Sequence, residues 1–364
     1  MKQLIDLNNK TILVTGSPGF IGANLVLRLL STLSGGTVVS FDNMNGYYDP
    51  SLKEYRLSLI NEASKESKVN HIFVKADLAD KAAVDRTFAE YKPAIVVNLA
   101  AQAGVRYSID HPEDYVSSNI IGFFNILEAC RHSYSISSDG YYGVEHLVYA
   151  SSSSVYGGNK KMPFSTDDKV DNPVSLYAAT KKSDELLAHS YSKLYNIPST
   201  GLRFFTVYGP AGRPDMFYYS ATKTLISNEV IRIFNYGDMK RDFTYIDDII
   251  EGIYRVMGGA PKKSAEKDGL PIPPYALYNI GSGTPENLMD YISILQEELV
   301  RAGVLDEAYD FDGHRKLVGM QAGDMAVTYA DSKALERDYG FRPQIGIREG
   351  LRKFAKWYKE YYKI

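Results

Sequence analysis

The stretch that decides the fold is Lys10–Leu30, KTILVTGSPGFIGANLVLRLL. A short apolar strand, Thr11–Thr15, leads into a glycine-rich turn and then into an amphipathic helix, whose predicted inward positions are Ile21, Leu25, Val26, Leu29 and Leu30. The turn glycines recur every three residues, which lets the backbone turn tightly and approach a pyrophosphate closely. Because free N–H groups at the helix start face such phosphates, the turn predicts a dinucleotide site. Its predicted contacts are Gly16, Gly19, Phe20, Ile21 and Gly22.

The second apolar strand, Thr37–Phe41, ends in an acidic residue. Asp42 lies 20 residues after Gly22, where a carboxylate accepts hydrogen bonds from both hydroxyls of the adenosine ribose and repels a 2′-phosphate. The sequence therefore predicts NAD rather than NADP, with Asn43 beside Asp42 as a further contact. The alternative is that Asp42 only starts a turn.

Strand-like and helix-like segments alternate after this first unit. The further buried strands that we expect are His71–Lys75, Ala94–Leu99, His146–Ala150 and Thr200–Phe204. The helices that we expect between them are Asp80–Tyr91, Pro112–Arg131 and Val174–Tyr195. Such alternation predicts an α/β fold with a doubly wound parallel (Rossmann) sheet, whose ligands bind at the carboxyl ends of the strands.

Small or polar residues stand at those predicted strand ends. Asp77 and Leu78 are placed to frame the adenine, and Ala100 and Ala101 are small enough to admit the nicotinamide ribose, with Leu99 before them as a further cofactor contact. The alternative is that these are plain loop residues.

The regular alternation weakens beyond Tyr208, which indicates a smaller C-terminal α/β substrate lobe. We expect a helix at Ser220–Asn228, a strand at Ile231–Phe234, a Pro- and Gly-rich surface loop at Ala260–Tyr275, and amphipathic helices at Asn287–Ala302 and Ile347–Ile364. The last helix favours a packed lid over a membrane contact. The dinucleotide-binding domain is assigned to residues 1–205 with a return segment at about 240–260, and the substrate lobe to 206–239 and 261–364.

Composition narrows the function classes. With 364 residues and a net charge of −3, the chain has no basic excess that would suggest nucleic acid as a partner. Its six histidines show no close pairing at ligand spacing, so no metal is predicted. Cys130 is the only cysteine, no stretch has the length of a membrane span, and a cytoplasmic location is the default expectation.

Tyr177 and Lys181, in YAATK, lie one above the other on a helix face. This pair opens the helix that follows the strand end Ser151–Ser154. Lys181 and the cationic nicotinamide ring of NAD⁺ would stabilise the phenolate of Tyr177, which makes it a usable general base. Lys181 would also reach the nicotinamide ribose, and Ser152 would share a hydrogen bond with the substrate oxygen being oxidised. The alternative is a structural Tyr–Lys pair.

The chain resembles the extended short-chain dehydrogenase/reductases that act on nucleotide sugars. The resemblance rests on TGSPGFIG, NLAAQAGVRYS, SSSSVYG, YxxxK, LRFFTVYGP and RDFTYIDD. Within that family, the runs NGYYDPSLKE, PVSLYAATKK, GRPDM and FNYGDMKRDFTYIDD resemble UDP-glucuronate 4-epimerases of bacteria and plants. The similarity extends from Lys10 to about Gly350. Two positions depart from the pattern: Ala211 stands where Trp is frequent, and Ala322 replaces the usual Pro of QPGD.

The resemblance implies a reaction in which Tyr177 removes the proton of the C4 hydroxyl while the C4 hydride passes to tightly held NAD⁺. The 4-keto sugar then turns over and regains hydride on its other face. Because a 4-keto glucuronate is a β-keto acid that loses CO₂ readily, its carboxylate must be held out of alignment with the carbonyl. The neutral donors expected to do so are Ser152, Ser153, Ser154 and Thr206. A dehydratase would instead need an Asp-Glu pair where Ser153 and Ser154 stand.

The resemblance also implies contacts for the diphosphate and the uracil of a UDP-sugar substrate. Arg213, Arg241 and the turn from Gln321 to Asp324 match the family's nucleotide contacts, since arginines suit bidentate phosphate binding. Arg106 would neighbour the sugar carboxylate or the diphosphate, and Asn119 would shape the active site. Each arginine alone is also consistent with a solvated or structural cation.

The leading hypothesis is an NAD-dependent 4-epimerase that converts UDP-glucuronate to UDP-galacturonate. The alternatives within enzymes are a UDP-glucose or UDP-N-acetylhexosamine 4-epimerase and a UDP-glucuronate decarboxylase. A non-enzyme alternative is an NAD-binding regulatory module, which would have no need of a base at Tyr177. A homodimer is expected from the resemblance, through the helices Pro112–Arg131 and Val174–Tyr195, whose apolar faces could equally be intramolecular core.

Overall fold

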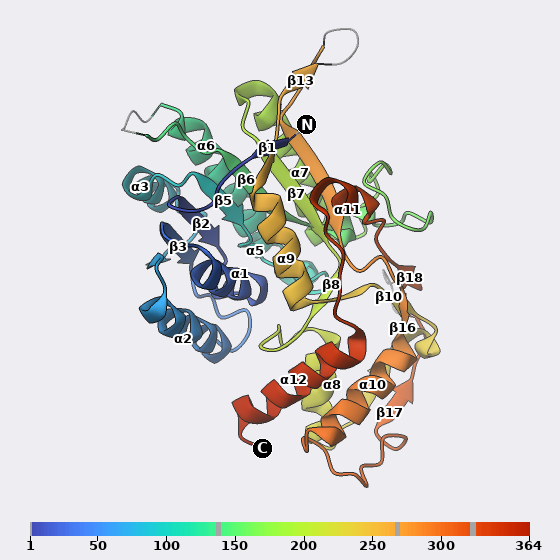
Figure 1. Ribbon diagram of the computed structural model, residues 1–364. Coiled ribbons are helices and arrows are strands. Elements are labelled where there is room, and N and C mark those ends of the chain that lie inside the picture. Colours follow the sequence, from blue (N-terminus) through green and yellow to red (C-terminus); the bar gives the residue numbers. More distant parts are fainter. Residues whose placement is uncertain (1, 136–139, 266–269, 321–324) are drawn as a thin grey trace.

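Parallel strands form the central sheet of the computed structural model, which describes residues 2–135, 140–265, 270–320 and 325–364 (Figure 1). The sheet has seven strands in the order β15-β7-β6-β5-β2-β3-β4, and every neighbouring pair is parallel. The strands are β2 (Thr11–Thr15), β3 (Thr37–Asp42), β4 (Asn70–Lys75), β5 (Ile95–Asn98), β6 (His146–Ser152), β7 (Ser199–Phe204) and β15 (Tyr275–Ile280). The predicted doubly wound sheet is confirmed.

Helices cover both faces of this sheet (Figure 1). One face carries α1 (Phe20–Thr32), α2 (Ser51–Glu66) and α9 (Ile246–Met257), and the other carries α3 (Lys81–Tyr91), α6 (Gly122–Ser133) and α7 (Leu176–Tyr195). Alternate residues of β2 point to opposite faces of the sheet. Ile12 and Val14 belong to the apolar cluster that contains α1, and Leu13 belongs to the cluster that contains α3. The crossovers therefore leave the carboxyl ends of the strands at one open edge.

The edge strand β15 of the main sheet and the helix α2 do not appear among the predicted elements. β15 pairs with β7 from Tyr275 opposite Ser199 to Ile280 opposite Phe204, although its segment follows a Pro-rich stretch instead of a crossover helix. The buried positions of α2 are Leu52, Lys53, Arg56 and Ile60. Because two of those four are charged, the helix has no readable apolar stripe.

The predicted helix Pro112–Arg131 is continuous but irregular. It consists of α5 (Pro112–Tyr115), a π-helical turn at Val116–Ile121, and α6. Such π turns inside α-helices are frequent at functional sites. A short helix, α4 (Tyr107–Asp110), precedes it. Residues 133–143, SYSISSDGYYG, read as a loop in the sequence; this segment begins at the last residue of α6 and lies partly outside the described residues.

The second part of the molecule combines three helices with short strands. Its helices are α8 (Phe217–Ile226), α10 (Leu288–Arg301) and α12 (Ile347–Tyr362), and a shorter helix, α11 (Lys333–Tyr339), packs near α9. Its pairings are β9 (Ile231–Ile233) with β17 (Arg315–Leu317), β8 (Thr206–Tyr208) with β11 (Phe243–Tyr245), and β10 (Lys240–Arg241) between β16 (Glu286–Asn287) and β18 (Val327–Thr328). The helices predicted at Ser220–Asn228, Asn287–Ala302 and Ile347–Ile364 and the strand at Ile231–Phe234 are confirmed to within a few residues.

The predicted surface loop at Ala260–Tyr275 contains short antiparallel pairings instead. β12 (Gly259–Pro261) pairs with the N-terminal strand β1 (Lys2–Leu4), and β13 (Ser264–Ala265) pairs with β14 (Pro271–Ile272). The sequence hides them because each run has only two or three residues and lies among prolines and lysines.

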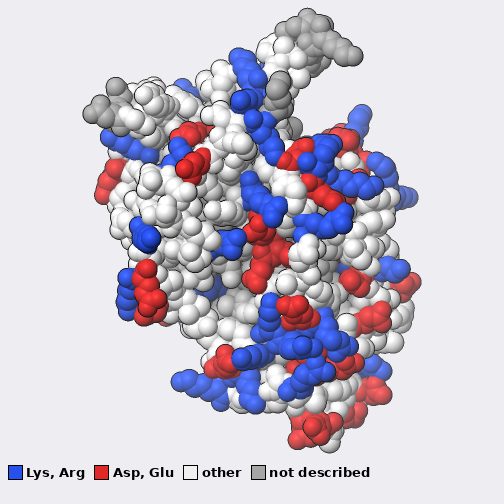
Figure 2. Space-filling view, viewed as in Figure 1, with Lys and Arg blue, Asp and Glu red and all other residues white. Residues whose placement is uncertain are grey.

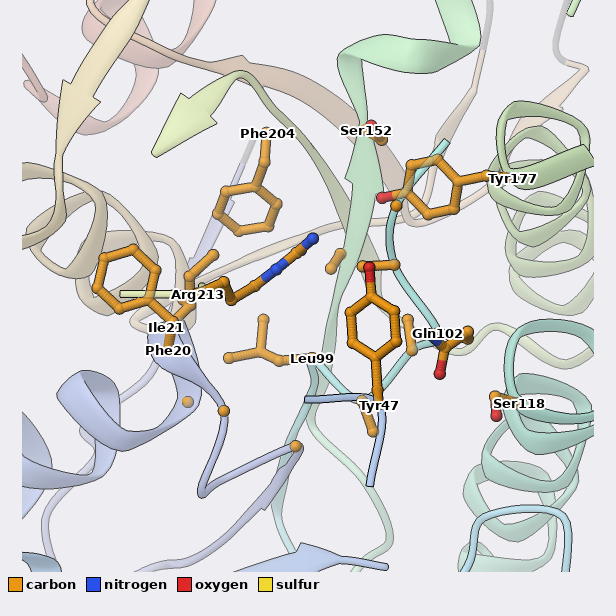
Figure 3. Close-up of a pocket in the computed structure, with 18 of the residues that line it drawn as sticks. Phe20, Ile21, Tyr47, Leu99, Gln102, Ser118, Ser152, Tyr177, Phe204 and Arg213 are labelled. Atoms are coloured by element: carbon orange, nitrogen blue, oxygen red, sulfur yellow. The ribbon is translucent and has the colours of Figure 1, made fainter. Parts of the chain in front are cut away.

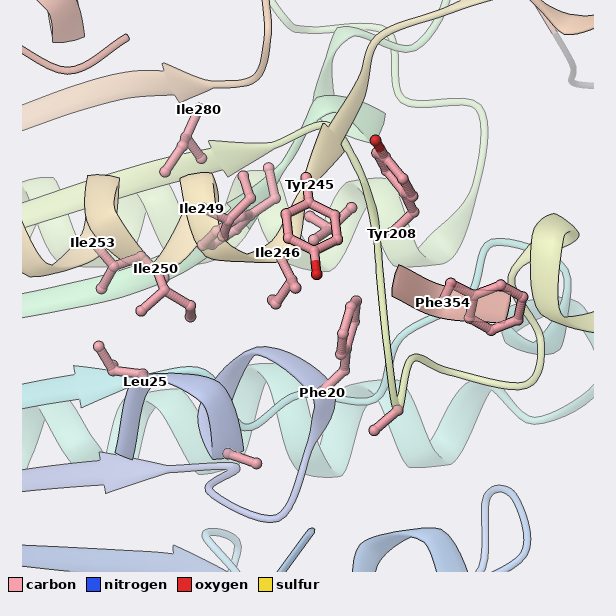
Figure 4. Close-up of a cluster of buried hydrophobic side chains, with 14 of the residues drawn as sticks. Phe20, Leu25, Tyr208, Tyr245, Ile246, Ile249, Ile250, Ile253, Ile280 and Phe354 are labelled. Atoms are coloured by element: carbon pink, nitrogen blue, oxygen red, sulfur yellow. The ribbon is translucent and has the colours of Figure 1, made fainter. Parts of the chain in front are cut away.

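One apolar cluster joins the two parts of the molecule (Figure 4). Phe20 at the start of α1, Ile246 at the start of α9, and Tyr208 and Tyr245 of the paired strands β8 and β11 meet Phe354 of α12 there. The second part is therefore packed directly against the beginning of the glycine-turn helix.

The helix α12 is a packed element with a charged outer face. It buries Leu351, Phe354 and Trp357, while Lys and Arg gather over it in Figure 2. Several of these cations pair with acidic neighbours, as in Arg348–Glu297 at 2.5 Å. Within the described ranges, no helix is long and apolar enough to cross a membrane.

The substitution Gly22→Ala should disrupt the first turn. A Cβ at Gly22 would lie 2.1 Å from the carbonyl oxygen of Gly16, so α1 would have to move away from the turn. We expect a loss of about 1–3 kcal/mol in the free energy of unfolding, together with a lower content of co-purified NAD. Denaturant unfolding and the absorbance of released dinucleotide measure the two effects.

A matched control is the exposed Gly158→Ala, because a Cβ at Gly158 meets no described atom within 4 Å. That variant should keep both stability and NAD content. A Gly22→Ala protein with unchanged stability and unchanged NAD content would contradict this packing.

Candidate active site

A cavity of about 460 Å³ opens at the carboxyl edge of the sheet (Figure 3). It is lined from the ends of β2, β3, β5, β6 and β7 and from the start of α7. The predicted site residues that line it are Gly16, Gly19, Phe20, Ile21, Gly22, Asp42, Asn43, Asp77, Leu78, Leu99, Ala100, Ala101, Ser152, Ser153, Ser154, Tyr177, Lys181, Thr206 and Arg213. Residues far apart in the sequence therefore meet in one cavity of the size of a small-molecule site.

Three predicted residues lie away from the cavity lining. Asn119 is buried in the π turn, where it accepts a hydrogen bond from the Gln102 amide at 2.8 Å and donates to Thr180 at 3.0 Å. The guanidinium of Arg106 lies 5.4 Å from the centre of the Phe234 ring, and Arg241 donates to the carbonyl of Ala326 at 3.1 Å. Gln321 and Asp324 lie outside the described residues.

The glycine-rich turn is held close to the neighbouring strand. Gly16 has a φ of +69°, and a Cβ there would lie 2.7 Å from the amide nitrogen of Ala100. Thr15 fixes that neighbour, because its hydroxyl donates to Asn98 at 2.7 Å and accepts from the Ala100 amide at 3.2 Å. The N-cap residue of α1 is Gly19, which has no side chain to accept from the first amides. Those amides face the cavity edge as anion donors.

Asp42 ends β3 as a buried carboxylate with its geometry fixed. Its Oδ1 accepts from the Met44 amide at 2.6 Å and lies 3.4 Å from Nζ of Lys53, which in turn donates to Asn45 at 2.8 Å. In the described part of the chain both contacts use Oδ1, which leaves Oδ2 for ribose hydroxyls. Asn43 donates to Asp77 at 2.8 Å and so ties the ends of β3 and β4 together.

Tyr177 and Lys181 lie in the first turns of α7, which begins at the N-cap Ser175. The Ser175 hydroxyl accepts from the Ala178 amide at 3.1 Å. The Tyr177 hydroxyl is directed into the cavity on the side where Ser152 lies (Figure 3). The Lys181 ammonium is buried and donates to Oδ2 of Asp184 at 2.8 Å.

Electrostatics keep Lys181 charged. Burial alone would lower the pKa of Lys181, but the negative charges of Asp184, Tyr177 and Glu185 outweigh it and raise that pKa. For Asp184 the balance goes the other way: burial raises its pKa from 3.8 to about 6 in spite of Lys181. Lys181 therefore stays positively charged beside Tyr177, while the carboxyl group of Asp184 gains a proton as the pH falls below about 6.

A second buried ion pair lies behind the serine-rich strand end. Arg203 of β7 donates to both oxygens of Glu185 at 2.7 and 2.9 Å. The Ser151 hydroxyl donates to the same carboxylate at 2.7 Å. Burial would raise the pKa of Glu185, but these partners lower it. The strand end that presents Ser152–Ser154 is therefore fixed to α7 by charge-assisted hydrogen bonds.

The opposite wall of the cavity carries Arg213. Its guanidinium reaches toward the middle of the cavity in Figure 3 and pairs with Asp215, with 3.0 Å between Nε and Oδ1. Tyr47 donates to Oδ2 of the same carboxylate at 3.3 Å. Burial, reinforced by Asp215, raises the pKa of Tyr47 to about 12, so this phenol is a neutral hydrogen-bond donor at physiological pH.

Several residues that line the cavity were not predicted from the sequence. They include Tyr47, Lys53, Gln102, Ser118 and Phe204. Tyr47 and Lys53 follow the carboxyl end of β3 in NGYYDPSLK, a position where ligand contacts are expected in such sheets. Ser118 gave no signal, because its exposure depends on the π turn.

The residues present fit a bound dinucleotide with unphosphorylated ribose. The glycine cradle has no room for a side chain, the amides at the start of α1 face it, and the buried Asp42 carboxylate stands at the next strand end. Among the described residues, no group of three or more His, Cys, Asp and Glu side chains is placed to hold a metal ion.

Residues 12–281 match the model of the NAD dependent epimerase/dehydratase family. The chain belongs to this family, and its cofactor is NAD. It is 38% identical over 359 residues to a probable UDP-glucuronate 4-epimerase of Rhizobium meliloti, covering 96% of this chain and 97% of that one. It is 46% identical over 358 residues to protein CapI of Staphylococcus aureus, covering 97% and 99%.

A solved structure is also similar to the chain. The crystal structure of UDP-glucuronic acid 4-epimerase from Bacillus cereus, in complex with UDP-glucuronic acid and NAD, matches with a TM-score of 0.79 and 29% identity. The match covers 97% of this chain and 100% of that one.

Asp184 should make stability depend on pH in a defined direction. Because its pKa is raised from 3.8 to about 6 by burial, the folded state binds a proton more tightly than the unfolded chain. Its contribution to stability is therefore present at low pH and falls as the pH rises from about 4 to about 6. We expect the free energy of unfolding of the wild type, minus that of Asp184→Asn, to fall by on the order of 2 kcal/mol over this interval.

Urea unfolding at successive pH values measures this difference. The exposed acid Asp85, paired with Lys81 on the surface of α3, provides the control Asp85→Asn, for which the difference should stay nearly flat. A flat profile for Asp184→Asn as well would contradict the raised pKa.

Proposed function

We propose that the chain is an NAD-dependent UDP-glucuronate 4-epimerase that forms UDP-galacturonate. The observation that carries the proposal is the placement of the hydroxyls of Ser152, Ser153, Ser154 and Thr206 in the same cavity as Tyr177 and Lys181. An acid–base residue beside a row of neutral donors suits a sugar that is oxidised next to a carboxylate. The names of the relative from Rhizobium meliloti and of the structure from Bacillus cereus support the same substrate.

Proton transfer at C4 is the task of Tyr177. Bound NAD⁺ supplies a reversible acceptor for the C4 hydride. The Tyr177 side chain is directed into the cavity, and as a phenolate it takes the proton of the C4 hydroxyl and returns it after the sugar has turned. Lys181 stabilises the phenolate that does this, and its buried charge is maintained by Asp184. Ser152 donates to the same sugar oxygen.

The neutral hydroxyls give the site its preference for a uronic acid. A 4-keto glucuronate loses CO₂ when the bond between C5 and C6 aligns with the carbonyl π system. Donors from Ser153, Ser154 and Thr206 hold the carboxylate away from that alignment without adding a charge. Dehydration lacks its acid here, because the positions after Ser152 are serines instead of an Asp-Glu pair.

The nucleotide half of the substrate is assigned to the wall that carries Arg213. Its planar guanidinium suits bidentate contact with a diphosphate, in exchange for part of its pairing with Asp215. Contacts from Arg106, Arg241, Gln321 and Asp324 to the substrate, and a role of Asn119 in shaping the site, remain proposals. So do the two-domain division at residues 1–205 with 240–260 and 206–239 with 261–364, and the cytoplasmic location.

The experiment is proton NMR of UDP-glucuronate incubated with the purified protein and no added NAD. We expect UDP-galacturonate to appear and to reach a constant ratio. Tyr177→Phe should lower the rate by about 10²–10⁴-fold while its content of bound NAD stays that of the wild type.

Each of the other possible results of this experiment would support one of the alternative functions. A UDP-pentose would indicate a decarboxylase, and turnover of UDP-glucose or UDP-N-acetylhexosamine but not of the acid would indicate a neutral-sugar epimerase. Bound NAD without turnover of any of these would favour a regulatory module. A fully active Tyr177→Phe protein would contradict the mechanism.

We also propose that the protein forms a homodimer through α6 and α7. The π turn, α6 and α7 expose the large apolar side chains Val116, Ile121, Phe124, Leu186 and Leu194. Leu186, with 60% of its surface exposed, lies on a helix that contacts α6, so the two helices can present one apolar face to a second copy.

The substitution Leu186→Glu should convert a dimer into a monomer, because it buries an unpaired charge in the interface. Light scattering coupled to size exclusion measures the mass. Leu59→Glu on α2, also an exposed leucine, should leave the mass unchanged. A wild-type monomer would contradict the proposal.

A further inference from the structure

The side chain of Arg56, on α2, connects three segments around the cavity. It is 1% exposed. Its Nη1 donates to the carbonyl of Pro18 at 3.1 Å and to the Tyr48 hydroxyl at 2.7 Å. Its Nε donates to the carbonyl of Ala211 at 2.9 Å, and its Nη2 donates to that of Gly212 at 2.9 Å. One guanidinium thus holds the glycine-rich turn and the turn that immediately precedes Arg213.

The turn before Arg213 adopts a backbone conformation that serves this contact. Ala211 has a φ of +50°, a conformation that costs a non-glycine residue free energy and persists only where its surroundings impose it. Two successive carbonyls of this turn reach the same guanidinium. On its other side the Tyr218 hydroxyl donates to the carbonyl of Gly209 at 3.1 Å. The direction in which the chain enters Arg213 is therefore fixed from both sides.

The charge of Arg56 is not neutralised by a carboxylate. Within the described residues its acceptors are carbonyl and phenol oxygens, and no Asp or Glu oxygen lies within 4.0 Å. A buried cation with neutral partners costs free energy unless an anion comes near. The segments that Arg56 holds are the turn predicted to bind the pyrophosphate of NAD and the turn that presents Arg213 to the substrate diphosphate.

We propose that Arg56 is a positioning residue: it fixes the Ala211–Gly212 turn so that Arg213 is aimed at the substrate diphosphate, and through Pro18 it links this turn to the NAD site. The inference rests on the proposed function for the identity of the diphosphate. Arg56 acts through Arg213 and Pro18 and does not contact the reacting atoms.

The test compares Arg56→Lys with the wild type by calorimetric titration of UDP into the NAD-loaded enzyme. Lysine keeps the charge but cannot donate to both carbonyls at once. We expect the Kd of UDP and the KM of the UDP-sugar to rise about 10-fold, the equivalent of one lost hydrogen bond to a charged group, with kcat changed less than about threefold. The molar content of NAD in the purified protein should also fall, because the contact with Pro18 is weakened.

A double-mutant cycle distinguishes positioning from simple destabilisation. If Arg56 acts through Arg213, then Arg56→Lys should raise the Kd of UDP less than about twofold in an Arg213→Lys background, because coupled residues are not additive. Full additivity of the two effects would overturn the inference. Ile60→Val, a core substitution one turn further along α2, should lower the melting temperature without changing the Kd.

Two further outcomes are informative. If Arg56→Lys does not fold, Tyr218→Phe releases the same turn from its other side and should raise the Kd of UDP in the same direction, whereas an unchanged Kd would overturn the inference. If the wild type binds NAD but not UDP, the proposed function fails. In that case the NAD content of the purified protein tests the link between Arg56 and the NAD site. An NAD content in Arg56→Lys equal to that of the wild type would overturn the positioning role of Arg56.

Discussion

The close contact between α1 and the glycine-rich turn is the constraint on which the rest of the molecule depends. A methyl group at Gly22 would overlap the carbonyl of Gly16, and one at Gly16 would overlap the backbone at Ala100. Because these backbones touch, the amides at the start of α1 point at the space above β2 and β5. The same start of α1 carries Phe20, which packs against Tyr245 and Ile246. The position of the second part of the molecule is thus set from the same turn that lines the cavity.

Tyr177 is supported by two layers of buried charge. Lys181 and Asp184 form the layer next to Tyr177, and Glu185 with Arg203 forms the layer behind it. The two acids are adjacent on α7, but their pKa values are shifted in opposite directions. Glu185 has a bidentate arginine and a serine as partners, which lower its pKa. Asp184 has one ammonium as a partner, its Oδ1 accepts no hydrogen bond from the described residues, and burial raises its pKa. The carboxylate with more hydrogen-bond partners is thus the one whose pKa is lowered.

The sequence was sufficient for those parts of the fold in which local pattern and tertiary role agree. Apolar strands followed by glycine or small residues predicted six strands of the sheet and the residues at their carboxyl ends. It was not sufficient where the buried face of an element is polar. The helix α2 buries Lys53 and Arg56, both of which lie near the cavity. These buried charges interrupt the apolar stripe by which the helix could have been predicted. β15 was missed for another reason: its partner strand is distant in the sequence, and no local signal records that pairing. Arg106 and Arg241, singled out by resemblance alone, lie outside the cavity lining, because a motif fixes the type of a residue but not the contacts of its side chain.

Charge balance explains how a chain with a net charge of −3 presents a site for anionic ligands. The basic residues that line the described cavity are Lys53, Lys181 and Arg213, and each lies within 4 Å of its own carboxylate, on Asp42, Asp184 and Asp215. Such pairs have a small net field, so long-range attraction contributes little to recognition. Recognition of an anionic ligand therefore depends on short-range, directional contacts. The groups available for them are the amides at the start of α1, the row of hydroxyls, and Arg213, whose position is fixed by its backbone. A site of this kind discriminates by the position of its donors, and its affinity should depend more on the turns that aim those donors than on added surface charge.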